Sequence, residues 1–136
     1  MPSGTDAGTK GNVLLVDDDQ FLLDLYATKF LRSGYDVHVY LSAEKALDDL
    51  RSGLKPDVII TDIVMAELDG FAFLQTVRSE HLADGTPRIV LSNQSTSADL
   101  TRAAQLGVAR LIIKATMTAN EVVAVVDQLI AKEAST

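Results

Sequence analysis

The chain has 136 residues, of which 47% are hydrophobic and 23% charged, as expected for one globular domain. Its formal charge of -7 argues against direct nucleic-acid binding, and the absence of cysteine excludes disulfides, thiolate metal sites and cysteine nucleophiles. No apolar run approaches the roughly 20 residues that span a bilayer, so we expect a reduced, soluble, cytoplasmic protein without membrane contact.

The chain begins with a small, polar segment over 1–11 that lacks the apolar stretch of a signal peptide, and we expect a disordered lead-in there. One domain is expected over 12–132, with a short tail over 133–136. The first strand is predicted at the apolar run 13–16. A helix follows from Asp19 or Gln20 to near Gly34. The apolar residues predicted to face inward from it are Phe21, Leu22, Leu25, Phe30 and Leu31.

Apolar and polar residues alternate over 36–40, which predicts an edge or half-exposed strand. Ser42 is placed to cap a second helix that runs to about Ser52 and ends at Gly53. The residues predicted to face inward from this helix are Ala43, Ala46, Leu47 and Leu50.

The rest of the chain repeats the same alternation of strand and helix. Strands are predicted at the apolar runs 58–60, 89–91 and 111–113. The helices between and after them are expected around 71–77, over 99–106 and over 118–131. Alternation of this kind predicts an α/β fold, a five-stranded parallel sheet with helices on both faces and right-handed crossovers.

Polar residues stand where the predicted strands end, and in such sheets sites form at the carboxyl ends of the strands. Asp17, Asp18 and Asp19 follow the first strand, and Asp62 follows the third. Ser92 and Lys114 end the fourth and fifth strands. We therefore expect carboxylates, a hydroxyl and an ammonium in one crevice.

This set of side chains has a chemical logic. Two carboxylates about 4 Å apart repel by roughly 4 kcal/mol at an effective dielectric of about 20, so a group of three needs a cation. Oxygen ligands favour Mg²⁺ or Mn²⁺, which can neutralise phosphoryl oxygens during transfer. A neighbouring carboxylate can act as the nucleophile and form an acyl phosphate, while the lysine and serine hold the remaining phosphoryl oxygens.

These residues resemble the response regulator receiver domain of two-component signalling, over about residues 12–132. The matching motifs are the acidic pair after the first strand, Thr61-Asp62 with the loop to Asp69-Gly70, Ser92 and Lys114. The resemblance implies a flavodoxin-like (βα)5 doubly wound fold, of the chemotaxis single-domain type. It implies phosphorylation of Asp62 by a sensor histidine kinase or phosphotransfer protein in a Mg²⁺-dependent reaction.

The resemblance also implies a role for each matching position. Asp17, Asp18 and Asp62 are expected to hold the metal together with the backbone carbonyl of Val64. Ser92 is expected to bind a phosphoryl oxygen and to move on phosphorylation, and Lys114 to pair with the phosphoryl group and with Asp62. Such a domain catalyses its own phosphorylation and dephosphorylation without being a conventional enzyme. Its output is expected through a downstream protein or through an output domain, if the chain is excised from a longer protein.

Two positions depart from the family pattern. Leu111 stands where the family has a tyrosine or phenylalanine that swings inward, so we expect a weaker or different output change. Ala115 replaces the proline after the lysine, and a non-proline cis bond costs about 2.5–4 kcal/mol, so a trans Lys114–Ala115 bond is predicted.

Other positions near Asp62 are expected to tune the site. Ala66 replaces a proline in the following loop, and Asn93 is bulkier than the residue common after the hydroxyl position. The resemblance implies that Val64 and Gln94 set the lifetime of the phosphoryl group. Asp19 and Asp69 are interpreted as helix caps or solvated residues, and Phe21 and Tyr26 as core residues.

Alternatives stay open. The last helix is apolar on more than one stripe, which indicates either a broad inner face or a surface for a weak homodimer. A pseudo-receiver that binds partners without cycling phosphate fits Leu111 and Ala115. An Asp-nucleophile phosphatase is disfavoured because Val64 stands where such enzymes carry a second acid, and no glycine-rich nucleotide motif follows the first strand.

Overall fold

The chain folds into a five-stranded parallel sheet between two layers of helices. The computed structural model describes residues 9–65, 67–93 and 96–134. The strands pair in the order β2-β1-β3-β4-β5, and all four pairings are parallel. Their bounds are β1 Asn12–Val16, β2 Asp36–Tyr40, β3 Val58–Asp62, β4 Arg88–Ser92 and β5 Arg110–Ile113.

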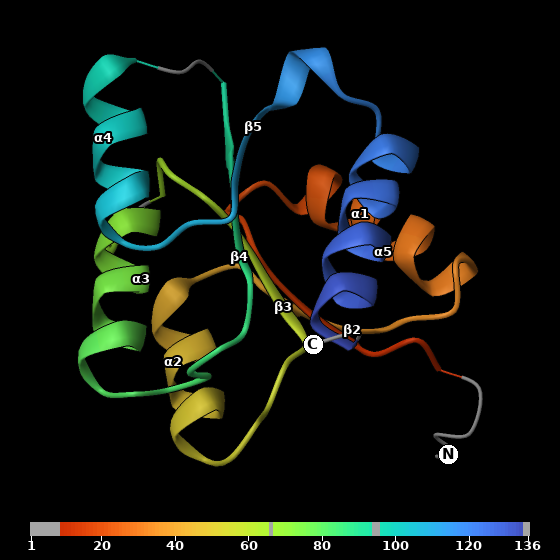
Figure 1. The fold of residues 1–136 in the computed structure, drawn as a ribbon, viewed down its shortest axis with the longest axis horizontal. Coiled ribbons are helices and arrows are strands. Elements are labelled where there is room, and N and C mark those ends of the chain that lie inside the picture. The colour runs from red at the N-terminus through yellow and green to blue at the C-terminus, as the bar shows by residue number, and fades with distance from the viewer. Residues whose placement is uncertain (1–8, 66, 94–95, 135–136) are drawn as a thin grey trace.

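The helices cover both faces of this sheet, as Figure 1 shows with the sheet seen edge-on: α1 and α5 on one side, α2, α3 and α4 on the other. Their bounds are α1 Gln20–Arg32, α2 Ala43–Arg51, α3 Gly70–Ser79, α4 Ser97–Gln105 and α5 Ala119–Ala134, with the short 3₁₀ helix η1 at Lys114–Thr116. The predicted doubly wound α/β fold is therefore confirmed, including β2 as an edge strand.

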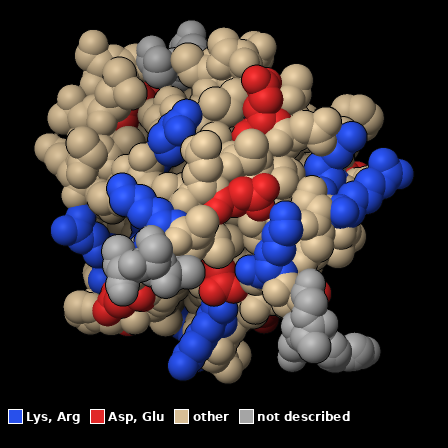
Figure 2. Space-filling model, turned by 45° about the vertical axis from the view of Figure 1, so that its right-hand side comes forward, with Lys and Arg blue, Asp and Glu red and all other residues tan. Residues whose placement is uncertain are grey.

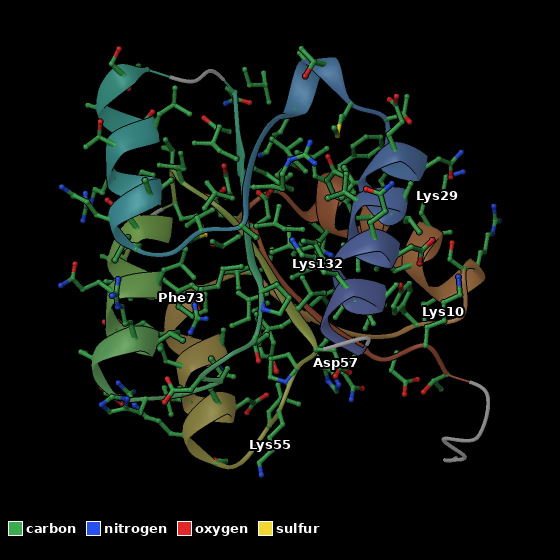
Figure 3. All side chains as sticks on the ribbon, viewed as in Figure 1. Lys10, Lys29, Lys55, Asp57, Phe73 and Lys132 are labelled. Atoms are coloured by element: carbon green, nitrogen blue, oxygen red, sulfur yellow. The ribbon has the colours of Figure 1, made fainter. Side chains whose placement is uncertain are left out.

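The central strands β1, β3 and β4 carry continuous apolar runs because their side chains enter two cores, one on each face of the sheet. Along β1, Val13 and Leu15 lie in the core beneath α1 and α5, while Leu14 and Val16 lie in the core beneath α2, α3 and α4. Figure 3 shows Phe73 on α3, across the sheet from Lys132 on α5, and the Phe73 side chain is fully buried. A strand buried on both faces has no polar position to alternate with, which explains the continuous runs.

Polar caps set where most helices begin. Asp19, Ser42 and Asp69 accept backbone N–H bonds at the starts of α1, α2 and α3, which confirms Asp19 and Asp69 as caps. Thr96 caps α4, so this helix starts two residues before the predicted Asp99. At α5, Thr118 and Glu121 bond to each other's backbone N–H in a capping box.

The inward face of α1 was predicted correctly for Leu22 and Phe30 and incorrectly for the other residues. Phe21 is 75% exposed and Leu31 57%, and Leu25 is also exposed, whereas Leu23 and Tyr26 are buried. This helix is apolar on most of its circumference, so its sequence is compatible with two stripes, and the position of the sheet selects the one through Leu23, Tyr26 and Phe30. Phe21 is consequently a surface residue rather than a core residue.

The broad apolar surface of α5 is an inner face. Val122, Val123, Val125 and Val126 are buried, and Leu129 and Ile130 pack partly buried against the same core. This helix lies against both the sheet and α1, which accounts for the width of its apolar surface. The described residues of α5 therefore support the interpretation of a broad inner face.

The lengths of the helices and the distribution of surface charge can be compared with the expectations from composition. Among the described residues, every helix is too short or too polar to cross a membrane. On the face shown in Figure 2, basic and acidic side chains are interspersed among uncharged ones, without a continuous basic surface.

Candidate phosphorylation and metal site

Three carboxylates converge at the carboxyl end of the sheet. Asp17 follows β1 and Asp62 ends β3, and these strands are neighbours in which Val16 pairs with Thr61. Oxygen atoms of Asp17, Asp18 and Asp62 all lie within 4.8 Å of one another. Asp17 and Asp62 are 3% and 6% exposed, and Asp18 is exposed, so the group opens to solvent on the Asp18 side.

Lys114 reaches the two buried carboxylates from the end of β5. Its Nζ lies 3.1 Å from Oδ2 of Asp17 and 3.4 Å from Oδ2 of Asp62. The lysine side chain is 13% exposed. The sequence interpretation paired Lys114 with Asp62, and the structure adds Asp17 as the nearer partner. The three carboxylates and this ammonium sum to a charge of -2.

The two buried carboxylates are held in the same way. Oδ1 of Asp17 accepts the N–H of Asp19 at 2.9 Å, and Oδ1 of Asp62 accepts the N–H of Ile63 at 2.8 Å. In each residue the backbone therefore fixes one oxygen, and the other oxygen faces Lys114. The side chains are thus oriented before any ligand binds.

The electrostatics reflect this unbalanced charge. Burial and the charge of Asp17 raise the pKa of Asp62, and Lys114 only partly offsets them. Burial works against the charge of Lys114, but the hydrogen bond and charge of Asp17 and the charge of Asp62 outweigh it and raise the pKa of Lys114. The lysine stays charged, and the site retains an excess of negative charge.

Gly70 is a residue of the site whose role the sequence did not reveal. A Cβ added at Gly70 would lie 1.9 Å from the main-chain oxygen of Asp62, and the Gly70 N–H bonds to the oxygen of Ile63 at 2.8 Å. The Asp62 oxygen also accepts the hydroxyl of Thr61 at 2.9 Å. The start of α3 therefore packs directly on the backbone of Asp62, and only glycine fits there.

Ser92 lies at the same end of the sheet as Asp62. It ends β4 and is 6% exposed, and β4 pairs with β3 through Leu91 and Asp62. Val64 and Asn93 are exposed, Val64 at 73%. Gln94 and Ala66, both predicted to affect the site, lie outside the described residues. The structure thus places Ser92 at the carboxyl end of β4, the strand beside β3, and leaves Val64 facing solvent.

The two departures from the expected pattern are both on or after β5. Leu111 pairs with Val90 and packs partly buried against the core beneath α2, α3 and α4. Ala115 lies in η1, and no peptide bond among the described residues is cis, which confirms the predicted trans Lys114–Ala115 bond. Lys114 therefore reaches the carboxylates without a cis bond.

Tyr26 is a second residue whose relation to the site the sequence did not reveal. As predicted it is a core residue, 5% exposed on α1. Its phenol, however, lies within electrostatic reach of Lys114, Asp17 and Asp62. Burial is the main cause that raises the pKa of Tyr26, so the phenol stays neutral beside the charged groups. An apolar stripe in the sequence predicts burial, and it does not predict where the polar end of a tyrosine lies.

The residues present fit a hard divalent cation. The possible ligands are carboxylate oxygens, and the carboxylate of Asp18 is exposed to solvent. The three carboxylates and Lys114 have a net charge of -2, which one Mg²⁺ or Mn²⁺ would neutralise. Asp17, Asp18 and Asp62 are the side chains that could hold it. A carboxylate beside such an ion and an ammonium can accept a phosphoryl group.

Comparison with known proteins identifies the domain family that the sequence motifs resemble. The family model of the response regulator receiver domain matches residues 13–127. The chain is 34% identical over 92 residues to the heme response regulator HssR of Staphylococcus epidermidis, covering 68% of this chain and 39% of that protein. It is 31% identical over 102 residues to the Regulator of RpoS of Escherichia coli, covering 75% and 29%. The chain thus spans less than half the length of these relatives.

Solved structures show the same fold. The receiver domain of the Francisella response regulator 1452 has a TM-score of 0.80 and 28% identity, covering 90% of this chain and 98% of that one. A CheY-like receiver domain protein of Methanospirillum hungatei has a TM-score of 0.82 at 18% identity, covering 91% and 96%, and supports the fold alone.

Proposed function

Because the chain belongs to the response regulator receiver domain family, we propose that it accepts a phosphoryl group on Asp62 in a Mg²⁺-dependent reaction and acts as a signalling switch. The donor is the phosphohistidine of a sensor histidine kinase or a phosphotransfer protein. The observation that carries the proposal is the arrangement of Asp17 and Asp62, each with one oxygen fixed by the backbone and the other facing Lys114.

Each residue of the site has its own role in the proposed reaction. Asp17, Asp18 and Asp62 would hold a divalent cation, which would neutralise charge on the phosphoryl oxygens. A carboxylate oxygen of Asp62 forms the new O–P bond as the donor's P–N bond breaks, and the electron pair of that bond returns to the imidazole nitrogen. Lys114 binds a phosphoryl oxygen, and the Ser92 hydroxyl can donate to another. Dephosphorylation by water then resets Asp62.

The proposal is tested with a small phosphoryl donor. Acetyl phosphate with Mg²⁺ should add one phosphoryl group to the chain, as seen by intact mass, and beryllofluoride should shift NMR signals around Asp62. Asp62→Ala should abolish both responses, while Asp24→Ala, which removes an exposed carboxylate on α1, should leave them intact. A wild-type chain that responds to neither reagent would instead be a pseudo-receiver, the alternative that Leu111 and Ala115 keep open.

We propose that a donor protein docks on exposed apolar side chains that lie close in sequence to the carboxylates of the site. Phe21, in the first turn of α1, is 75% exposed, and Val64, after β3, is 73% exposed. Phe21→Ala should slow transfer from a phosphorylated donor protein roughly tenfold, equivalent to about 1.4 kcal/mol. Transfer from acetyl phosphate should be unchanged, because that donor does not touch α1. Leu100→Ala, at an exposed leucine on α4, is the matched control.

The proposal for how the switch acts on other proteins starts from the greater length of the relatives. They are more than twice as long as the part that this chain matches, and HssR is named as a response regulator. Phosphorylation of Asp62 therefore acts through a downstream protein or through an output domain, in the cytoplasm. Leu111 in place of an aromatic residue predicts that this output change is weaker than in receivers with the ring.

A further inference from the structure

A pocket of about 460 Å³ lies at the end of the sheet opposite the carboxylates. Its walls come from the loop before β4, the turn before β5 and the last turns of α5. Arg88 begins β4 and Ala109 precedes β5, whereas Ser92 and Lys114 stand at the other ends of these strands. The pocket is thus separate from the candidate phosphorylation site, and its volume lies in the range of small-molecule sites, roughly 300–1,000 Å³.

The charge of this pocket is opposite to that of the chain. The chain carries a formal charge of -7, yet the charged side chains that line the pocket are Arg88 and Lys132, and no acidic residue of the described chain lines it. Apolar surface beside the two cations comes from Pro87, Ala109 and Leu129. The pocket therefore combines two positive charges with an apolar wall in one concave surface.

Arg88 is held in place by main-chain oxygens and not by a carboxylate. Its Nη1 donates to the oxygen of Thr86 at 2.7 Å, and its Nη2 donates to those of Leu82 and Ala83 at 3.5 and 3.3 Å. Within the part of the chain that the structure describes, the guanidinium forms no ion pair. The three bonds fix its position and leave further N–H donors for a ligand. A half-buried cation of this kind is stabilised by an anion beside it.

We propose that this pocket binds a small organic phosphate monoester, with the phosphate facing Arg88 and Lys132 and the organic part against Pro87 and Leu129. A phosphate monoester carries about -1.5 to -2 at neutral pH on a single group, so it balances both cations, whereas one carboxylate balances one. The guanidinium fork matches phosphate oxygens, and lysine binds them as a point charge. The proposal does not depend on phosphorylation of Asp62, because the pocket lies at the other end of the sheet.

Phenyl phosphate, added without Mg²⁺ and followed by amide NMR signals, is the probe for this proposal. Gly85, Gly107 and Ala109, which line the pocket, should shift with a Kd of about 1 mM or lower, and benzoate and benzyl alcohol should bind at least about tenfold more weakly. Because Arg88 also holds the loop before β4, the exposed Lys132 is the residue to change. Lys132→Glu should raise the Kd at least about tenfold. Lys45→Glu makes the same change of charge at an exposed position on α2, across the sheet, and should leave the Kd within twofold.

The position of the shifts and the two variants decide the outcome. The metal-free carboxylates repel an anion, so shifts confined to the residues around Asp17 and Asp62 would overturn the proposal. So would the absence of shifts at the pocket residues up to about 10 mM phenyl phosphate. Equal weakening by Lys132→Glu and Lys45→Glu would also overturn it, because the probe would then respond to the net charge of the chain. Benzoate binding as tightly as phenyl phosphate would refute the preference for a phosphate group.

Discussion

Two sets of ion pairs in this molecule differ in geometry and in purpose. On the surface, Arg51 of α2 binds Glu80 at the end of α3 with two parallel bonds of 2.8 Å, and both side chains are exposed. At the site, Lys114 reaches Asp17 and Asp62 at the longer distances of 3.1 and 3.4 Å, and all three side chains are largely buried.

The difference teaches that the shorter contact is not the more consequential one. The Arg51–Glu80 pair is balanced in charge and faces water, which screens it. The site holds more negative charge than Lys114 neutralises, and its low exposure makes every charge there count for more. A balanced surface pair joins α2 to α3, whereas the unbalanced buried group suits the cation and the phosphoryl group of the proposed function.

The largest effect is expected from a change at the site that alters no charge. Gly70→Ala places a methyl group against the Asp62 carbonyl, which is fixed in the central strand, and should cost at least about 3 kcal/mol of unfolding free energy. Gly85→Ala, at a φ of +82° with open space around it, should cost only about 1–2 kcal/mol. Urea unfolding measures both, and equal losses would refute the special role of Gly70.

Mg²⁺ should stabilise the site and not the surface pair. At a hundredfold excess over its Kd, a ligand that binds only the folded state adds about 2.7 kcal/mol, which should appear as an increase in Tm. Asp18→Asn should remove most of this increase while keeping the ion pairs of Lys114, because Asp18 is the exposed member of the group and those pairs join Lys114 to Asp17 and Asp62. Asp48→Asn, beside Arg51, should keep the full increase.

Removing charge from the buried site should stabilise the metal-free protein. The raised pKa of Asp62 means that the folded state disfavours its ionised form, so Asp62→Asn should increase Tm at neutral pH. The penalty exists above the raised pKa and disappears below the ordinary value of 3.8, so the two proteins should converge in acid. Thermal unfolding from pH 7 to pH 3 without metal checks this, and an unchanged or lower Tm at pH 7 would contradict it.

The smallest effect, of opposite sign, is expected at the surface pair. Arg51 lowers the pKa of Glu80, so the pair stabilises the fold above the ordinary glutamate range and loses this contribution as the pH falls through the lowered value. Glu80→Gln should therefore decrease Tm slightly at neutral pH, by at most about 2 °C. The decrease should shrink in concentrated salt, and a salt-independent loss would show that packing rather than charge is involved.

Most of the fold could be predicted from the sequence because the three central strands are buried on both faces. Short, continuous apolar runs such as 58–60, bounded by polar residues, are typical of strands in the middle of a parallel sheet, and the polar residues after them mark its carboxyl edge. The face of α1 could not be predicted, since leucines and aromatic residues lie on nearly every side of it. Only the sheet decides that Leu23 is buried and Phe21 exposed.

The charged residues of the candidate site could be predicted from the sequence, but the residues that pack around them could not. Asp17, Asp62 and Lys114 each end a predicted strand, so their convergence followed from the fold. The contact of Gly70 with the Asp62 carbonyl depends on the angle at which α3 meets β3, which no residue pattern encodes. The same holds for Tyr26, whose hydroxyl position depends on the direction of a side chain inside the core.

The burial of β3 has a consequence for the signal proposed to start at Asp62. This strand is central in the sheet, with β1 and β4 on either side, and all five of its residues are buried. Its amide protons should exchange with deuterium only through global unfolding, among the slowest in the chain. We therefore expect Asp62 to stand on one of the least mobile backbone segments of the domain, and under the proposed phosphorylation the loops and side chains around it would carry the response.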